Sequence, residues 1–189
     1  MGNMVEIKDE LDELRLKWFM EKIYKNDKEE KKIVEELVKN FIELLFKVYE
    51  VQKEDKRKLS TLILFNLNTS LYTKTYKQLF YAADDDIYLN KPLAASYKVC
   101  EYIENSRCEI RDFINDYKKS KKNNSYDKSE YERYILKGYD HINEFFLNKA
   151  SDMIVEQDIL KSINKDIDCK LLIGKYMGEL KIIKEIQTN

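Results

Sequence analysis

Hydrophobic residues recur at helical spacing most clearly between residues 28 and 55. Two rows with seven-residue spacing run through this stretch: Val34, Phe41 and Val48, and Leu37, Leu44 and Val51. On the polar side, Glu43 and Lys47 are four residues apart, in the order that favours an ion pair along a helix. The pattern predicts an amphipathic helix over about 28–55 that packs into the core of a helical bundle, with a dimerisation helix as the alternative.

Weaker helical periodicity occurs in other parts of the chain. We expect further helices over about 5–25, 59–83, 92–118, 131–146 and 151–163. Polar residues at 66–70 interrupt the second of these, so a bend or a new helix start is expected near 68–70. The helix over 92–118 is expected to begin at Pro92, because proline suits the first helical position and disfavours the helical conformation at Lys91 before it.

The last segment, "CKLLIGKYMGELKIIKEI", fits two structures. As a helix, it places Gly174 and Gly178 on one face, where they permit close approach of a neighbouring helix. As a β-hairpin, it turns near Met177 and Gly178. Its length and its lysine and glutamate content favour the helix, and the hairpin remains the alternative.

Glycine and proline are scarce, with 4 and 1 among 189 residues. All-β folds need frequent turns, which use these residues, so the composition argues against them. Together with the periodicity, it predicts an all-α fold: an irregular bundle of six to eight helices. We expect a single domain over residues 1–189, with a flexible polar loop at 118–128.

Charged residues make up 37% of the chain, but 34 basic residues balance 35 acidic ones. This balance argues against a nucleic-acid partner, which usually requires a basic excess. No stretch approaches 18 apolar residues and the N-terminus has no signal-peptide pattern, so we expect no membrane partner. The three cysteines are Cys100, Cys108 and Cys169, and no pair has the spacing of a zinc or redox motif. These features predict a reduced, cytoplasmic protein.

The stretch "YAADDDIYLNKP" holds three consecutive aspartates and the only proline. Asp84 and Asp86 are candidate metal ligands. However, an EF-hand beginning at Asp84 would need glycine at Leu89 and glutamate at Ala95, so the calcium motif is absent. We expect a connector that ends one helix and begins the next, with solvated carboxylates. Tyr81 and Tyr88 are expected to form the rim of a contact surface.

No catalytic set stands out in the sequence. His141 is the only histidine, so the chain cannot supply the paired motifs of di-iron bundles or the ligands of common zinc sites. No glycine-rich phosphate loop is present either. We therefore expect a protein without catalytic residues and without a cofactor, with a metal-dependent enzyme using Asp84 and Asp86 as one alternative.

The chain contains 14 tyrosines. Several of them fall on or beside the predicted inner helix faces, and a buried tyrosine needs a partner for its hydroxyl group. Together with His141, they would form a tyrosine-lined pocket between helices that binds a small molecule. The candidate ligand-binding residues are Tyr72, Tyr76, Tyr97, Tyr131, Tyr134 and His141.

Three short stretches, "SLYTKTY" (70–76), "IYLNKP" (87–92) and "LLIGKYMGE" (171–179), resemble parts of an uncharacterised helical protein family of low-GC Firmicutes. The resemblance implies a bacterial source and suggests that residues 70–92 form one structural unit. That family has no known activity, so it supplies no functional residues.

The function predicted from the sequence is that of a non-enzymatic protein-interaction or regulatory module. It would bind a partner protein or associate with itself as a homodimer. The expected contact elements are the helix over 28–55 and the tyrosine-bearing region around 70–97. The small-molecule sensor and the metal-dependent enzyme are the two alternatives.

Overall fold

The computed structural model describes residues 27–67, 75, 77–99 and 128–187, without the side chains of 27 and 128–139. The elements are α2 (Asp27–Gln52), β1 (Leu59–Asn66), β2 (Lys77–Ala83), β3 (Ala94–Val99), α5 (Lys128–Val155), α6 (Ile159–Ser162), β4 (Lys165–Lys175) and β5 (Leu180–Glu185). The protein is therefore a mixed α/β protein with a five-stranded sheet, and the prediction of an all-α bundle of six to eight helices is wrong. The predicted helix over 5–25 lies outside the described residues, as does the loop expected at 118–128 except for Lys128, where α5 begins. Among the described residues, no helix combines the length and apolar character needed to cross a membrane.

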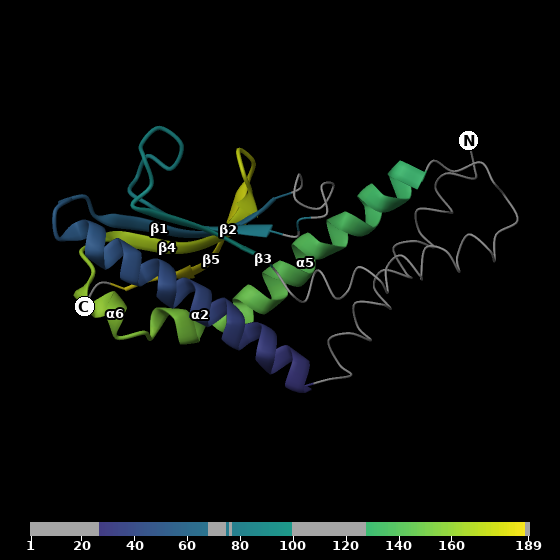
Figure 1. Cartoon of the computed structure of the whole chain (residues 1–189), viewed down its shortest axis with the longest axis horizontal. Helices are drawn as coiled ribbons and strands as arrows, with labels where there is room; N and C mark the ends of the chain where they lie inside the picture. The colour runs from purple at the N-terminus through teal and green to yellow at the C-terminus, as the bar shows by residue number, and fades with distance from the viewer. Residues whose placement is uncertain (1–26, 68–74, 76, 100–127, 188–189) are drawn as a thin grey trace, which may run out of the picture.

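The five strands form one sheet in the order β3-β2-β1-β4-β5. The central pair, β1 and β4, is parallel, and every other neighbouring pair is antiparallel. Figure 1 shows α2, α5 and α6 on one side of this sheet, and the β2–β3 and β4–β5 connections rising on the other side. We call the first side the helix face and the second side the loop face.

The main hydrophobic core lies between the helices and the helix face. Phe41 on α2 meets Phe80 on β2 with ring centroids 5.0 Å apart in an edge-to-face arrangement. Both rows of the seven-residue repeat take part up to Val48, so the helix predicted over 28–55 is confirmed as α2. The hydrophobic side of this helix is occupied by the core and is therefore not free to act as a dimerisation face. The helix predicted over 131–146 is likewise confirmed, as part of α5.

The predicted helix over 59–83 is wrong, because this segment forms β1 and β2. Seven of the eight residues of β1 are buried. Leu62 and Leu64 join the core on the helix face, whereas Ile63 and Phe65 join a second cluster on the loop face. A strand covered on both faces loses the apolar–polar alternation that identifies strands in a sequence.

The last segment forms the β4–β5 hairpin, so the preference for a helix is wrong and the alternative is correct. Gly174 does permit a close approach, but to the neighbouring strand: a Cβ atom there would be 2.2 Å from the backbone oxygen of Glu179. The helix expected to begin at Pro92 is also wrong. Its first residues form β3, an edge strand that begins two residues after Pro92.

Candidate binding surface

The aspartate stretch belongs to the connection between β2 and β3, and Arg57 organises this connection. The guanidinium group of Arg57 donates to the Asp84 carboxylate at 3.3 Å and to the backbone oxygen of Lys91 at 2.6 Å. It also contacts Asp55 at 2.6 Å, and these hydrogen bonds hold the pKa of Asp55 below its ordinary value. Arg57 thus links the segment that precedes β1 to both ends of the β2–β3 connection.

Asp84 and Asp86, the candidate metal ligands, are linked by an asparagine. The Asn90 side-chain amide donates to Asp84 at 3.3 Å and to Asp86 at 3.4 Å. Arg57 supplies the positive charge next to Asp84. Among the described residues, no group of three or more histidine, cysteine, aspartate or glutamate side chains is arranged to hold a metal ion.

Four aromatic side chains meet where the two connections fold over the loop face. Phe65, fully buried on β1, contacts Tyr81, Tyr88 and Tyr176 with ring centroids 5.4 to 6.2 Å apart. Tyr88 and Tyr176 also contact each other, at 5.9 Å. The Tyr81 hydroxyl donates to the backbone oxygen of Ile87 at 2.7 Å, which fixes the loop. Burial raises the pKa of Tyr81, and the neighbouring Tyr176 and Asp84 raise it further.

The turn between β4 and β5 holds a side chain in a strained position. The Gly178 N–H donates to the Lys175 oxygen at 2.9 Å, which closes a four-residue turn with Tyr176 and Met177 in its centre. Met177 has a φ of 61°, a left-handed conformation that is uncommon for a residue with a long side chain. Its side chain is 71% exposed.

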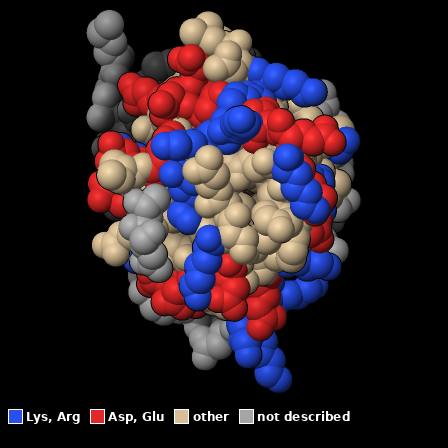
Figure 2. Space-filling model, turned by 90° about the vertical axis from the view of Figure 1, so that its left-hand side faces the viewer, with Lys and Arg blue, Asp and Glu red and all other residues tan. Residues whose placement is uncertain are grey.

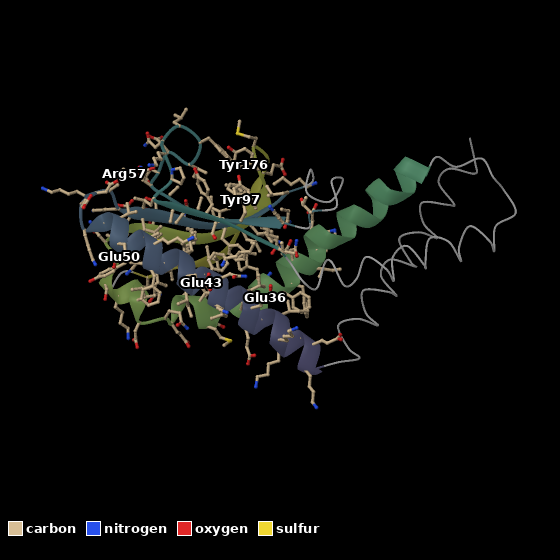
Figure 3. All side chains as sticks on the ribbon, viewed as in Figure 1. Glu36, Glu43, Glu50, Arg57, Tyr97 and Tyr176 are labelled. Atoms are coloured by element: carbon tan, nitrogen blue, oxygen red, sulfur yellow. The ribbon has the colours of Figure 1, made fainter. Side chains whose placement is uncertain are left out.

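Exposed hydrophobic side chains gather on this side of the molecule. Tyr97 is opposite Leu79, and Ile182 is opposite Leu172, so both point to the loop face. Of the eleven large hydrophobic side chains that are exposed in the described part of the chain, seven lie on the loop face or on its two connections. We call these seven residues the aromatic surface: Tyr88, Leu89, Tyr97, Val99, Tyr176, Met177 and Ile182. Figure 3 shows Tyr97 and Tyr176 on this side of the sheet, and Glu43 on the helix side.

The charges next to the aromatic surface are mainly acidic at the β2–β3 connection. Asp85 and Asp86 are exposed beside Tyr88 and Leu89. Lys175, at the other connection, is paired with Asp140 on α5 at 3.2 Å. On the face of the molecule drawn in Figure 2, acidic and basic side chains alternate around an uncharged region, without a continuous basic stripe.

The residues predicted to line a ligand pocket are not all described. Tyr72 and Tyr76 lie outside the described residues, and Tyr131 and Tyr134 belong to α5 without described side chains. Tyr97 is exposed on the loop face of β3, and His141 is exposed on α5. Because both side chains are exposed, neither lines a buried pocket between helices.

Sequence reasoning identified part of the aromatic surface. Tyr88 is exposed, in keeping with its expected place at the rim of a contact surface, but Tyr81, expected there with it, is buried. Tyr97 and Leu89 lie in the expected contact region around 70–97, although Leu89 is not singled out by the sequence. The sequence does not indicate Val99, Ile182, Tyr176 or Met177. The hairpin alternative contained a signal for the last two, because residues in the middle of a tight turn are usually exposed.

Comparison of the chain with protein-family models, with curated proteins and with solved structures found no significant match.

Proposed function

We propose that this chain is a non-enzymatic, cytosolic protein-binding module that takes its partner on the aromatic surface. The observation that carries the proposal is the concentration of exposed hydrophobic side chains on the loop face and its two connections. Exposed hydrophobic residues that are scattered singly need no explanation, whereas a contiguous group of them marks a contact site. The ring contact between Tyr88 and Tyr176 joins the two connections into one such group.

The kinds of residue present support a protein partner. Tyrosine and methionine are enriched at protein interfaces, and tyrosine is frequent among the residues that contribute most to binding. Tyr88 and Tyr176 support each other's positions through their ring contact. A partner would therefore meet side chains that lose little conformational freedom on binding.

The acidic side chains define the chemistry of the partner. Asp85 and Asp86 are exposed beside Leu89, while Arg57 is occupied by Asp55 and Asp84. A segment that buries apolar side chains against this surface and carries lysine or arginine beside them would be complementary in charge. We infer that the partner is a protein segment with apolar residues flanked by basic ones.

A random peptide library displayed on phage and selected on the immobilised full-length chain tests this proposal. We expect the selected peptides to combine apolar and basic residues. Their affinity should fall about 5-fold or more in Tyr176→Ser and in Leu89→Ser, because truncating a central contact typically costs more than 1 kcal/mol.

Phe46→Ser is the matched control, because Phe46 on α2 and Tyr176 are both 53% exposed. Phe46 lies outside the aromatic surface, so this variant should bind the selected peptides as the wild type does. If no peptide is selected, or if Tyr176→Ser and Phe46→Ser weaken binding equally, the aromatic surface is not the binding site.

A further inference from the structure

The two edge strands of the sheet differ in their protection against pairing with another chain. The pairing of β5 with β4 is irregular between Leu171 and Leu172 of β4, and three of the six residues of β5 are charged. β3 has an unbroken register with β2 and a single charged residue, Lys98. Bulges and charged side chains are the usual means of blocking an edge. β3 is thus the less protected edge, and within the described residues no strand lies on its outer side.

We propose that β3 pairs antiparallel with β3 of a second copy of this chain, across a two-fold axis at Tyr97. Residues that are opposite each other in a sheet point to the same face. A two-fold axis perpendicular to the sheet therefore places one residue opposite its own copy, and the central candidates in β3 are Ser96, Tyr97 and Lys98. The dimer would have one continuous sheet of ten strands.

The side chains of β3 favour Tyr97 on the axis over Lys98. With Tyr97 on the axis, the two Tyr97 rings meet on the loop face, and Ala95 lies opposite Val99 of the second copy. On the helix face, Ser96 lies opposite Lys98. With Lys98 on the axis, two lysines would lie directly opposite each other, which destabilises strand pairing.

The charges of α2 distinguish Tyr97 from Ser96 as the axis residue. Lys47 on α2 donates to Ser96 at 3.4 Å, and Glu43 on α2 is hydrogen-bonded to Lys98. Lys47 thus lies level with Ser96, and Glu43 lies level with Lys98. With Tyr97 on the axis, Lys47 of each copy faces Glu43 of the other copy. With Ser96 on the axis, Lys47 would face Lys47, so charge complementarity selects Tyr97.

The dimer goes beyond the partner-binding function and does not depend on it. It would join the two loop faces into one surface with both Tyr97 side chains at its centre. A partner with two binding segments would then gain avidity from contacts with both copies.

Cysteine cross-linking tests the register. Cys100 and Cys108 are first replaced by serine. Cys169 is retained, because burial raises the pKa of its thiol to about 12 and keeps it unreactive. Under mild oxidation, Tyr97→Cys should form a disulfide-linked dimer, because directly opposed Cα atoms are about 4.5–5.5 Å apart, within disulfide range.

The Ala95→Cys and Val99→Cys variants, alone and mixed, give a second test of the register. Ala95→Cys alone and Val99→Cys alone should stay uncrosslinked, because each residue is about 14 Å along the strand from its own copy. A mixture of the two variants should form a heterodimer. Efficient cross-linking of Ser96→Cys, or failure of Tyr97→Cys to cross-link, would overturn the proposed register.

Light scattering of the unmodified chain tests the dimer itself. At about 100 µM, even a weak dimer with a micromolar dissociation constant would form. We expect twice the 22.8 kDa chain mass. Tyr97→Lys, which places like charges on the axis, should give the single-chain mass with an unchanged circular dichroism spectrum. A single-chain mass for the wild type refutes the dimer. It leaves the partner-binding proposal intact, because peptide binding is measured separately with the Tyr176 and Leu89 variants.

Discussion

Replacing Met177 with glycine should make the protein more stable. Met177 is the third residue of the β4–β5 turn and has a φ of 61°. Turns that need a positive φ at this position normally have glycine there. A left-handed conformation costs a residue with a Cβ atom about 1–2 kcal/mol, and Met177→Gly removes this cost.

Two smaller terms reduce the gain. Glycine has more conformational freedom in the unfolded chain, which costs about 0.5–1 kcal/mol. The loss of packing is small, because the Met177 side chain is 71% exposed. The net expectation is an increase of about 0.5–1 kcal/mol in the free energy of unfolding. For a chain of this size, this corresponds to a rise in Tm of about 1–4 °C.

Urea denaturation followed by circular dichroism measures the change, with thermal melting as a second measurement. Glu179→Gly is the matched control. Glu179 is exposed in the same connection, and Met177 is the one non-glycine residue with a positive φ among the described residues. Glu179→Gly should therefore lose about 0.5–1 kcal/mol. If Met177→Gly is no more stable than the wild type, the inference that the turn is strained is wrong.

The same substitution separates stability from binding. Met177 belongs to the aromatic surface, so Met177→Gly should weaken binding of the selected peptides several-fold although the protein is more stable. Unchanged affinity in this variant would mean that Met177 makes no contact with the partner.

Three further predictions concern the interior of the fold. Gly174→Ala should lower the free energy of unfolding by about 2 kcal/mol or more in urea denaturation, because the new Cβ atom would meet the Glu179 backbone oxygen; an unchanged midpoint would contradict this. Thr61→Val should raise the free energy of unfolding by about 1 kcal/mol, because the Thr61 hydroxyl is buried without a hydrogen-bond partner among the described residues; a loss of stability would show that the hydroxyl is satisfied. The raised pKa of Cys169, about 12, means that the folded state holds the thiol proton more tightly than the unfolded state does. The free energy of unfolding should therefore fall as the pH rises above about 9, by at most about 1.4 kcal/mol per pH unit. Urea titrations at several pH values measure this fall, and Cys169→Ala should lack the contribution from the thiol.

The sequence allowed accurate prediction of α2, which is covered on one side by the core. The polar and apolar sides of α2 are distinct, so its seven-residue repeat identified it correctly. β1 is buried on both faces, and its continuous apolar run "LILF" has no alternation to distinguish it from a buried helix. This ambiguity led to the wrong fold class.

Long-range pairing explains the other differences. Glu43 and Lys47 have the spacing of a pair within a helix, but in the folded protein Glu43 bonds to Lys98 and Lys47 bonds to Ser96. Arg57 contacts Asp84, 27 residues further along the chain. Local sequence patterns do not contain these partners, because they depend on where β3 and the β2–β3 connection lie in the sheet.

The parallel pairing of β1 with β4 has a consequence for synthesis of the chain on the ribosome. β1 ends at Asn66, and its neighbour β4 begins at Lys165, roughly a hundred residues later. At a translation rate of about 5–20 residues per second, the nascent β1 waits about 5–20 s for this neighbour. During that interval, one side of a strongly apolar strand remains unpaired, so the nascent chain is most open to aggregation or chaperone capture before β4 emerges.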